Sequence, residues 1–358
     1  MIRNCPSCNS DSFSLFYSSK YSFIPGLDTG LELKVGQCNF CKMAYIPTYI
    51  EESQLEVFYS TFSNYEYTEV NHWPKDDKLK SNRQFEYLKK FLSSDSFVVD
   101  FGCSLGYTLS LFQNSGFKTL GVETSPTAAE YARDNFNVKV ESLFFHDKMV
   151  FDHPEVDLFI LSHVLEHIWN PKALLQTLKK HLSENGLIYV EIPLLDVFED
   201  SRDPMPFTLE HVNYFSLDTM KYLLNVSGLR LRDFTLIHNL EGEAPNYTVG
   251  GFLIERDSVG EHEKSFAFNG LLEHKVKPSQ LRKTKWESWL YKNSQKNVVV
   301  WGAGNMGIQF YSMSSQKIKI IDGNPKKQFR NSEIQVLSPT DIVWNDVQFV
   351  VISSFGAF

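Results

Sequence analysis

A glycine-containing loop near residue 100 constrains the fold more than any other feature of this sequence. The segment Phe97–Phe101 is apolar except for Asp100, and glycines stand at positions 102 and 106 before a helical pattern over 108–114. This pattern is typical of a buried parallel strand, a tight loop and the start of a helix. The next strand-like segment ends at Glu123, about 20 residues after the loop begins, where an acid can bind the ribose hydroxyls of an adenosine. We therefore predict a nucleotide-binding corner.

Strand and helix patterns alternate from residue 96 to about 256. Strand-like segments lie at 97–101, 117–123, 137–140, 156–162 and 186–192, and helical patterns at 106–115, 126–135 and 170–182. Such alternation predicts an α/β fold with a doubly wound parallel sheet, which binds ligands at the carboxyl ends of its strands. Two further strands, at 229–237 and 248–255, are expected to be antiparallel and to complete the sheet.

The loop sequence at 100–106, D-x-G-C-x-x-G, resembles motif I of the class I S-adenosylmethionine-dependent methyltransferases, and Gly-Val-Glu-Thr-Ser at 121–125 resembles their motif II. The resemblance implies that the loop and the acid hold S-adenosylmethionine, with a glycine backbone close to the methionine part. The residues expected to bind this cofactor are Asp100, Gly102, Ser104, Gly106, Tyr107, Glu123, Thr124, Ser162 and His163.

Length and charge limit the other classes of function. The chain has 358 residues, which favours two or three domains, and its formal net charge is −8 without a basic stripe, so a nucleic-acid partner is not expected. The sequence contains neither an apolar run long enough to span a membrane nor an apolar signal region. We expect a cytoplasmic protein with a small-molecule substrate, and leave open whether it is a monomer or a homodimer.

Four of the five cysteines stand in two C-x2-C pairs, Cys5 with Cys8 and Cys38 with Cys41. Each pair can place two thiolates on one side of a tight turn, and two such turns form a closed tetrahedral Zn²⁺ site. Such a site is structural, because no position is left for water or substrate. Free buried thiols or a redox pair are the alternatives, and zinc is favoured because disulfides are rare in a reducing compartment.

The segment 51–95 is predicted to connect the cysteine region to the sheet. It has helical patterns at 52–59 and 82–91, separated by a polar, aromatic stretch. This stretch is either a surface loop or a lid over the cofactor and substrate, in which Tyr65 or Tyr67 contributes a hydroxyl to substrate binding.

Histidines follow two of the predicted strands. His163 and His167 come after the fourth strand, and Glu210 and His211 lie in the long segment between the fifth strand and the next helix. Because both places are at the carboxyl edge of the sheet, we predict that His211 is a general base supported by Glu210. His167 is predicted to stabilise the resulting oxyanion or to assist the base.

For each of these histidines, a structural hydrogen bond or a packing role is the alternative to catalysis. Two residues that follow His211, Asn213 and Tyr214, are expected to contact the substrate.

A second glycine loop, G-x-G-x-x-G at 302–307, follows an apolar strand and precedes a strand that ends in an acid at 322. By itself this pattern indicates NAD. About 60 residues follow position 297, so we expect a shortened unit whose loop holds another diphosphate, such as that of a nucleotide sugar. Gly302, Gly304 and Asn305 are the predicted substrate contacts.

The order of these features resembles the three-domain sugar C-methyltransferases that act on nucleotide-linked deoxy-keto-sugars. The resemblance implies an N-terminal zinc domain, a central S-adenosylmethionine domain and a C-terminal Rossmann-like domain that helps to hold the nucleotide sugar. The expected domains are 1–50 for zinc, 51–95 for the connector or lid, 96–256 for the methyltransferase core, 257–296 for a linker helix and 297–358 for the substrate-binding unit.

The chain departs from that family directly before its Glu-His pair. Family members usually have a tyrosine and a histidine there, and this chain has Thr208 and Leu209. The resemblance implies that the tyrosine assists the base histidine when the enolate of the keto-sugar forms. Methylation of oxygen or nitrogen, on a nucleotide sugar or a surface-polysaccharide precursor, is therefore the first alternative. An inactive cofactor-binding scaffold is the second, and an NAD oxidoreductase is the third.

Overall fold

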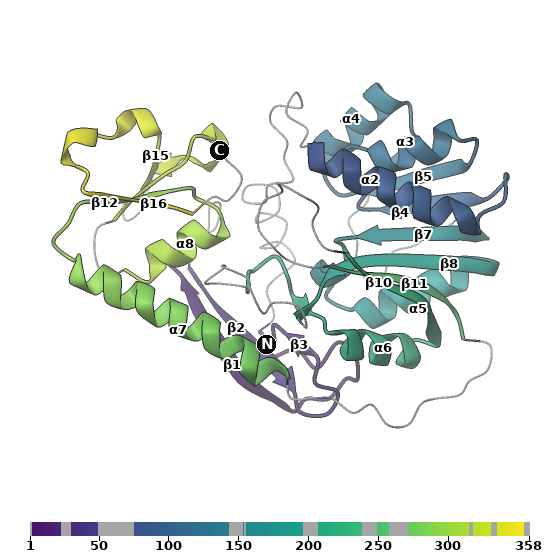
Figure 1. The fold of residues 1–358 in the computed structure, drawn as a ribbon, viewed down its shortest axis with the longest axis horizontal. Helices are drawn as coiled ribbons and strands as arrows, with labels where there is room; N and C mark the ends of the chain where they lie inside the picture. Colours follow the sequence, from purple (N-terminus) through teal and green to yellow (C-terminus); the bar gives the residue numbers. More distant parts are fainter. Residues whose placement is uncertain are drawn as a thin grey trace.

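The computed structural model of the chain describes residues 2–22, 30–48, 75–142, 153, 155–195, 207–237, 249–257, 271–314, 318–330 and 335–353. Within these ranges the strands form sheets of four, seven and five strands. Figure 1 shows the seven-stranded sheet with its helices on the right and the five-stranded sheet on the left. Tyr65 and Tyr67, with most of the predicted lid, lie outside the described residues.

The seven-stranded sheet confirms the predicted class I α/β core. Its order is β10-β11-β8-β7-β4-β5-β6, with β4 to β8 pairing in parallel and β11 running antiparallel to both β8 and β10. The bounds are β4 Phe97–Phe101, β5 Lys118–Glu123, β6 Val140–Ser142, β7 Val156–Ser162, β8 Leu182–Pro193, β10 Leu229–Ile237 and β11 Val249–Arg256.

Local sequence signals explain where the helices of this core begin. Ser125, Asn170 and Ser216 each accept a backbone hydrogen bond from the first turn that follows, which satisfies a donor that the helix itself leaves unpaired. Proline occupies the first position of two of these helices. The bounds are α2 Lys75–Leu88, α3 Tyr107–Asn114, α4 Pro126–Phe136, α5 Pro171–His181 and α6 Leu217–Val226.

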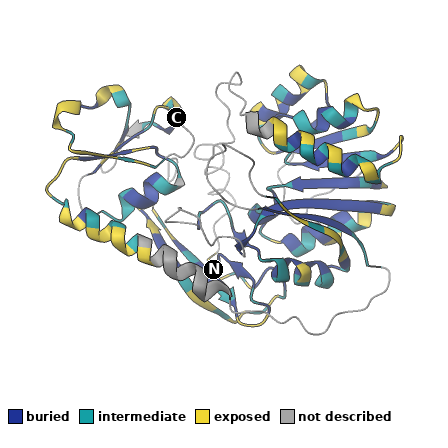
Figure 2. Cartoon of the chain, in the orientation of Figure 1, coloured by how far each residue is buried: buried dark blue, intermediate teal, exposed yellow. Residues whose placement is uncertain are grey.

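Two strands of the core begin more than one residue away from their predicted starts, and the helix predicted at 82–91 is α2, at Lys75–Leu88. The strand predicted at 137–140 begins at Val140, because Asn137 adopts a left-handed conformation (φ 53°) that ends α4. The strand predicted at 186–192 begins earlier, at Leu182. Its apolar residues are buried on both faces of the sheet, as Figure 2 shows for the neighbouring strands, because helices cover both sides.

The four-stranded sheet joins the cysteine region to the core. It contains β1 Phe13–Tyr21, β2 Leu31–Cys38, β3 Ala44–Tyr45 and β9 Asn213–Tyr214, in the order β1-β2-β3-β9 and antiparallel throughout. The last of these strands comes from the segment that carries His211. The N-terminal region is therefore connected to the predicted catalytic segment by main-chain hydrogen bonds.

The five-stranded sheet forms the C-terminal unit, in the order β14-β15-β13-β12-β16. All neighbours are parallel except β14 and β15. The linker helix expected within 257–296 begins at Leu271. The bounds are α7 Leu271–Lys292, β12 Val298–Trp301, α8 Asn305–Ser312, β13 Lys319–Ile321, β14 Phe329–Arg330, β15 Gln335–Leu337 and β16 Phe349–Ile352.

One hydrophobic core connects this unit to the N-terminal sheet. Tyr17 and Val35, from β1 and β2, belong to the same buried cluster as Leu290, Ile308 and Phe310. Among the helices that the structure describes, none has the length and apolar content that crossing a membrane requires.

Gly106 offers a test of the packing around the first glycine loop. It has φ 81°, and a Cβ atom there would lie 2.7 Å from the Cβ of Ala132. We expect Gly106→Ala to lower the free energy of unfolding by roughly 2–4 kcal/mol, from the left-handed backbone and from overpacking. Gly116→Ala is the matched control, because its φ is 91° and no atom lies within 4 Å of its Cβ position. Urea unfolding should show a loss of about 1 kcal/mol there, and equal losses at both sites would contradict the packing argument.

Candidate functional site

The first glycine loop is tightly constrained by its neighbours. The backbone N–H of Gly102 donates to the carbonyl oxygen of Val122 at 2.8 Å. Positive φ angles occur at Gly102, Ser104 and Gly106. A Cβ atom on Gly102 would lie 2.7 Å from Cγ2 of Val164, so the loop can approach the segment after β7 only without a side chain there. The loop and this segment therefore lie together at the carboxyl edge of the sheet.

Glu123 fastens the loop from the neighbouring strand. Its carboxylate accepts hydrogen bonds from the backbone N–H groups of Ser104 and Ser125, both at 2.8 Å, and from the Thr124 hydroxyl at 3.2 Å. Asp100 is buried beneath the loop, and burial raises its pKa to about 8. The predicted cofactor residues on β4 and β5 are thus in one place, and their contact with the cofactor stays a prediction.

The segment after β7 gathers two histidines around a buried acid. A short 3-10 turn spans Leu165–His167, and Glu166 within it is 2% exposed. His163 has a positive φ of 56°, and its Nδ1 lies 3.3 Å from Oε1 of Glu166. A left-handed backbone is uncommon for residues other than glycine and is often found at functional sites.

His211 completes this cluster from a distant part of the chain. One ligand atom each of Glu166, His167 and His211 lie within 4.8 Å of one another, and the two imidazole rings pack edge to face at 4.9 Å. Burial lowers the pKa of His211 to about 3, and His167 adds to this shift, whereas Glu166 opposes it. His211 is therefore neutral at pH 7, the state in which an imidazole can accept a proton.

Glu210 contributes to the cluster through its backbone. Its carbonyl oxygen lies 2.8 Å from Nδ1 of His167. This contact fixes the orientation of the His167 ring. Support of His211 by the Glu210 side chain stays a prediction.

Asn213 and Tyr214, which we predicted to contact the substrate, make internal contacts. Asn213 is fully buried, and its amide donates to the carbonyl oxygens of Leu165 (3.3 Å) and Ile168 (2.6 Å). The Tyr214 hydroxyl donates to the carbonyl oxygen of Thr208 at 2.9 Å. Both residues hold the histidine segments in place, and contact with a substrate stays a prediction for each.

Arg3 is a contributor that the sequence analysis missed. Its guanidinium donates to the side chain of Asn213 at 2.6 Å and lies over the ring of Trp169 at 4.6 Å. Arg3 comes two residues before Cys5, so the first cysteine turn is linked through Asn213 to the turn that holds His167.

A second buried acid, Glu191, was also missed. Its carboxylate accepts from Gln84 and from the Tyr189 hydroxyl at 2.9 Å, and it pairs with Arg83 at 3.2 Å. Gln84 also donates to the Ser162 hydroxyl at 2.9 Å. This network attaches α2 to the edge of the sheet beside the predicted cofactor residues. A charged residue within an apolar strand was the signal that could have revealed it.

Helix α2 also contacts the helix that follows the glycine loop. Asn82 lies 3.5 Å from the hydroxyl of Tyr107, and Ser81 accepts from Thr108 at 2.9 Å. Tyr107, a predicted cofactor residue, is therefore in contact with the helix that follows the predicted lid.

The four paired cysteines lie together. Sγ of Cys5 is 3.4 Å from Sγ of Cys41, and Sγ of Cys8 is 3.5 Å from Sγ of Cys38. The residue after each pair, Asn9 and Lys42, has a positive φ and donates its backbone N–H to the carbonyl oxygen of the first cysteine of its pair. Two such turns, with four sulfurs at this spacing, fit a tetrahedral Zn²⁺ ion.

The second glycine loop repeats the geometry of the first. Gly302 has φ 108° and donates its N–H to the Ile321 carbonyl oxygen, and Asp322 accepts from the backbone N–H of Ala303 at 2.8 Å. Gly304 precedes α8, with no atom within 4 Å of its Cβ position. The side chain of Asn305 lies outside the described residues. Substrate binding by this loop stays a prediction.

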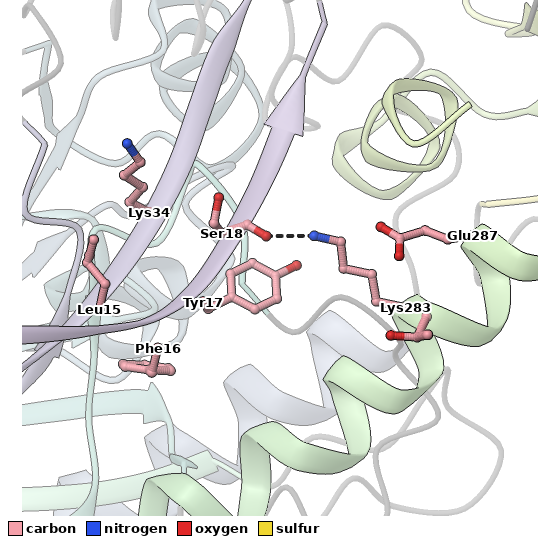
Figure 3. A pocket seen from close by; sticks show the side chains of 8 residues that line it. Leu15, Phe16, Tyr17, Ser18, Lys34, Lys283 and Glu287 are labelled. Atoms are coloured by element: carbon pink, nitrogen blue, oxygen red, sulfur yellow. Dashed lines mark hydrogen bonds between the residues drawn. The ribbon is translucent and has the colours of Figure 1, made fainter. Parts of the chain in front are cut away.

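A shallow hollow of about 560 Å³ lies between the N-terminal sheet and α7. Figure 3 shows Tyr17 and Lys283 facing each other across it, with Lys283 donating to the carbonyl oxygen of Ser18 at 2.7 Å. None of the predicted site residues lines this hollow, so it is separate from the candidate site at the edge of the central sheet.

The comparison with protein families agrees with this geometry. Residues 76–233 match the family described as methyltransferase domain. This part of the chain is similar to a methyltransferase domain. The matched residues include the first glycine loop, Glu123, the Glu166 cluster and Glu191.

One curated relative is the C-methyltransferase NovU of Streptomyces niveus. It is 27% identical over 146 residues, which cover 40% of this chain and 34% of the relative. The chain therefore spans about a third of the length of the relative it matches.

Solved structures are similar to the methyltransferase domain at low scores. A chain in the complex of the Haloferax volcanii Trm112 methyltransferase activator with a methyltransferase has TM-score 0.41 and 15% identity, covering 50% of this chain and 93% of that chain. An S-adenosylmethionine-dependent methyltransferase from Clostridium acetobutylicum has TM-score 0.38 and 14% identity. The match covers 57% of this chain and 98% of that chain. Scores at this level carry no argument about function.

The Glu191 network predicts a pH-dependent contribution to stability. Burial alone raises the pKa of Glu191, but Lys80 and Arg83 outweigh it and lower the pKa from 4.5 to about 2. This contribution, about 3 kcal/mol, is present above pH 4.5 and is lost as the pH falls to about 2. We expect Glu191→Gln to be less stable than the wild type at pH 7, with the difference shrinking below pH 4.5 in urea unfolding.

Glu184→Gln is the matched control, because Glu184 is exposed on the same strand. We expect it to change the free energy of unfolding by less than about 0.5 kcal/mol. A difference between Glu191→Gln and the wild type that stays constant from pH 7 to pH 3 would contradict the linkage.

Proposed function

We propose that the protein transfers a methyl group from S-adenosylmethionine to a nucleotide-linked sugar, with His211 as the general base. The observation that carries this proposal is the position of His211 beside Glu166 and His167, at the sheet edge that also carries the glycine loop of the methyltransferase domain. A neutral, half-buried imidazole at this edge suits proton removal from an acceptor.

The residues expected to hold the cofactor surround the first glycine loop. Gly102 and Gly106 allow the backbone to approach the cofactor, and Glu123 is the acid expected to bind its ribose hydroxyls. When bound, S-adenosylmethionine supplies an electrophilic methyl group. The protein then has to position the acceptor and remove one proton from it, because methyl transfer from a sulfonium is an in-line displacement.

His211 removes that proton, and His167 stabilises the oxygen that gains negative charge. Burial keeps both imidazoles neutral by lowering their pKa values. The Glu210 carbonyl oxygen holds the His167 ring through Nδ1. This arrangement serves a carbon acceptor next to a carbonyl group or a hydroxyl acceptor equally.

A carbon acceptor on a nucleotide sugar is the favoured substrate class. Support comes from the C-methyltransferase NovU relative and from the second glycine loop, whose open approach at Gly304 suits a diphosphate. Thr208 and the buried Leu209 favour the second candidate, transfer to oxygen or nitrogen, because no tyrosine is present at that place to assist with an enolate.

We also propose that Cys5, Cys8, Cys38 and Cys41 hold a structural Zn²⁺ ion. The sulfur spacing and the two left-handed turns support this ligand set. Its role is to fix the end of β2 and the start of β3, which pairs with β9 beside His211.

Incubation with S-adenosylmethionine and a panel of nucleotide sugars tests the function. We expect the wild type to add the mass of one methyl group to at least one sugar, and His211→Gln to lower the rate by roughly 100- to 10,000-fold, the usual contribution of a general base. Mass spectrometry of the sugars measures turnover, and calorimetry measures cofactor binding, which should be unchanged in the variant.

His153→Gln is the matched control, because His153 is part-buried and pairs with Glu141 on β6, away from the cluster. It should retain wild-type turnover. Near-normal turnover of His211→Gln would show that another group is the base, and NMR of the product distinguishes a new carbon–carbon bond from a methyl group on oxygen or nitrogen.

Removal of one cysteine ligand tests the zinc proposal without relying on activity. We expect Cys38→Ser to reduce the zinc content from about one ion per chain and to speed hydrogen exchange of the Ile46 and Val212 amides, which lie at the β3–β9 junction. Cys103→Ala is the control, because Cys103 lies outside the cysteine group. Full zinc content in Cys38→Ser would rule out the proposed ligand set.

A further inference from the structure

Glu166 is a buried acid enclosed by imidazoles. It is 2% exposed and lies on the turn after β7. Nδ1 of His163 approaches its carboxylate to 3.3 Å, and ligand atoms of His167 and His211 lie within 4.8 Å of it. The predicted catalytic pair was Glu210 and His211, and the acid that the fold brings to His211 comes from a different segment of the chain.

The surroundings keep Glu166 ionised. Burial alone raises its pKa, but the hydrogen bond from His163, together with the electrostatic effect of the neighbouring imidazoles, outweighs burial and lowers the pKa to about 2. A buried carboxylate is costly unless cationic or donor groups surround it. The cluster therefore holds a fixed negative charge at neutral pH, at the place where the proposed base would become positive.

A proton on His211 needs such a charge. Burial, His167 and His163 all lower the pKa of His211, and Glu166 raises it. On its own segment, Glu210 precedes it and the Tyr214 ring packs at 6.3 Å. A base with so low a pKa accepts a proton poorly unless the cation that forms is stabilised.

We propose that Glu166 is the positioning residue that stabilises the His211 imidazolium formed during methyl transfer. This inference rests on the proposed function. A proton leaves the acceptor carbon or oxygen for a ring nitrogen of His211, and the electron pair left behind forms the new bond to the methyl carbon. The bond from methyl to sulfur breaks, and its electron pair stays on the sulfur. Glu166 remains ionised throughout, so the cluster passes from one negative charge to a neutral ion pair.

Glu210 and Glu166 then have separate roles. The Glu210 backbone orients His167 through Nδ1, and the Glu166 side chain supplies charge to the cluster. The backbone of Glu166 also holds the base segment, because its carbonyl oxygen accepts from the N–H of Val212 at 2.9 Å. The distance between the charge and the base is fixed by this main-chain bond.

Glu166→Gln keeps the shape of the side chain and removes its charge. We expect kcat to fall roughly 10- to 100-fold, the range for losing an interaction with a charged group, while the dissociation constant for S-adenosylmethionine and the KM for the sugar stay within about twofold. Glu166→Asp retains the charge and should recover at least a tenth of wild-type kcat. A purely structural role would affect binding and kcat together, and that result would overturn the proposal.

Glu255→Gln is the matched control, because Glu255 pairs with Arg230 and Arg232 on the far strands of the sheet. It should leave kcat unchanged. If Glu166→Gln does not fold, carbon-13 NMR of the glutamate carboxyl groups in the wild type measures whether Glu166 is ionised. The Glu166 signal is assigned by its loss in Glu166→Asp. An ionised Glu166 at pH 7 supports the proposal, and a protonated one overturns it.

Two further outcomes separate this proposal from its premise. Retained turnover in His211→Gln would show that His211 is not the general base and would overturn the proposed function. An inactive His211→Gln together with a fully active Glu166→Gln would overturn only the role of Glu166.

Metal analysis tests whether Glu166, His167 and His211 bind a metal ion instead. A divalent cation beyond the one held by the cysteines, lost in Glu166→Gln, would assign the carboxylate to that ion and overturn the proposal.

Discussion

The pairing of β3 with β9 is the contact on which the arrangement of the candidate site depends. Two residue pairs form it, and main-chain bonds extend it, from Ile46 N–H to the Val212 carbonyl oxygen at 3.0 Å and from Val212 N–H to the Glu166 carbonyl oxygen at 2.9 Å. This chain of bonds runs from the cysteine turns to the histidine cluster. His211 lies beside it, so the position of the base is set by a sheet that begins near the N-terminus.

Buried carboxylates organise both sides of the sheet edge. Glu191 attaches α2 to the sheet through Arg83 and Gln84, and Glu166 gathers the imidazoles. Each remains ionised because its partners outweigh burial, with a pKa of about 2 in both cases. A buried carboxylate that loses its partners costs several kcal/mol of stability, roughly 3–5. The surrounding loops are therefore held in the one arrangement that keeps these partners in place. The electrostatics of the site are therefore also part of its structure.

The two glycine loops show that an acid after the second strand has a structural use as well as a ligand-binding one. Glu123 accepts from the backbone of the first loop, and Asp322 accepts from the backbone of the second. The same hydrogen bond from loop backbone to acid is therefore present in both loops. G-x-G-x-x-G at 302–307 therefore does not by itself indicate NAD, whereas the first loop lies within the residues that match a methyltransferase domain.

The sequence by itself determined the central sheet, its helix starts and the pairing of the cysteines in two turns, because these depend on local periodicity, capping residues and short spacings. It also indicated His167 and His211, which follow strands of a parallel sheet. Only the tertiary structure decided which acid faces His211 and that Arg3 reaches Asn213. The first contact joins Glu166 to His211, and the second joins Arg3 to Asn213, so both connect residues far apart in the chain. Spacing along the sequence carries no record of them, since they arise when β9, from the segment that carries His211, pairs with β3 of the N-terminal sheet.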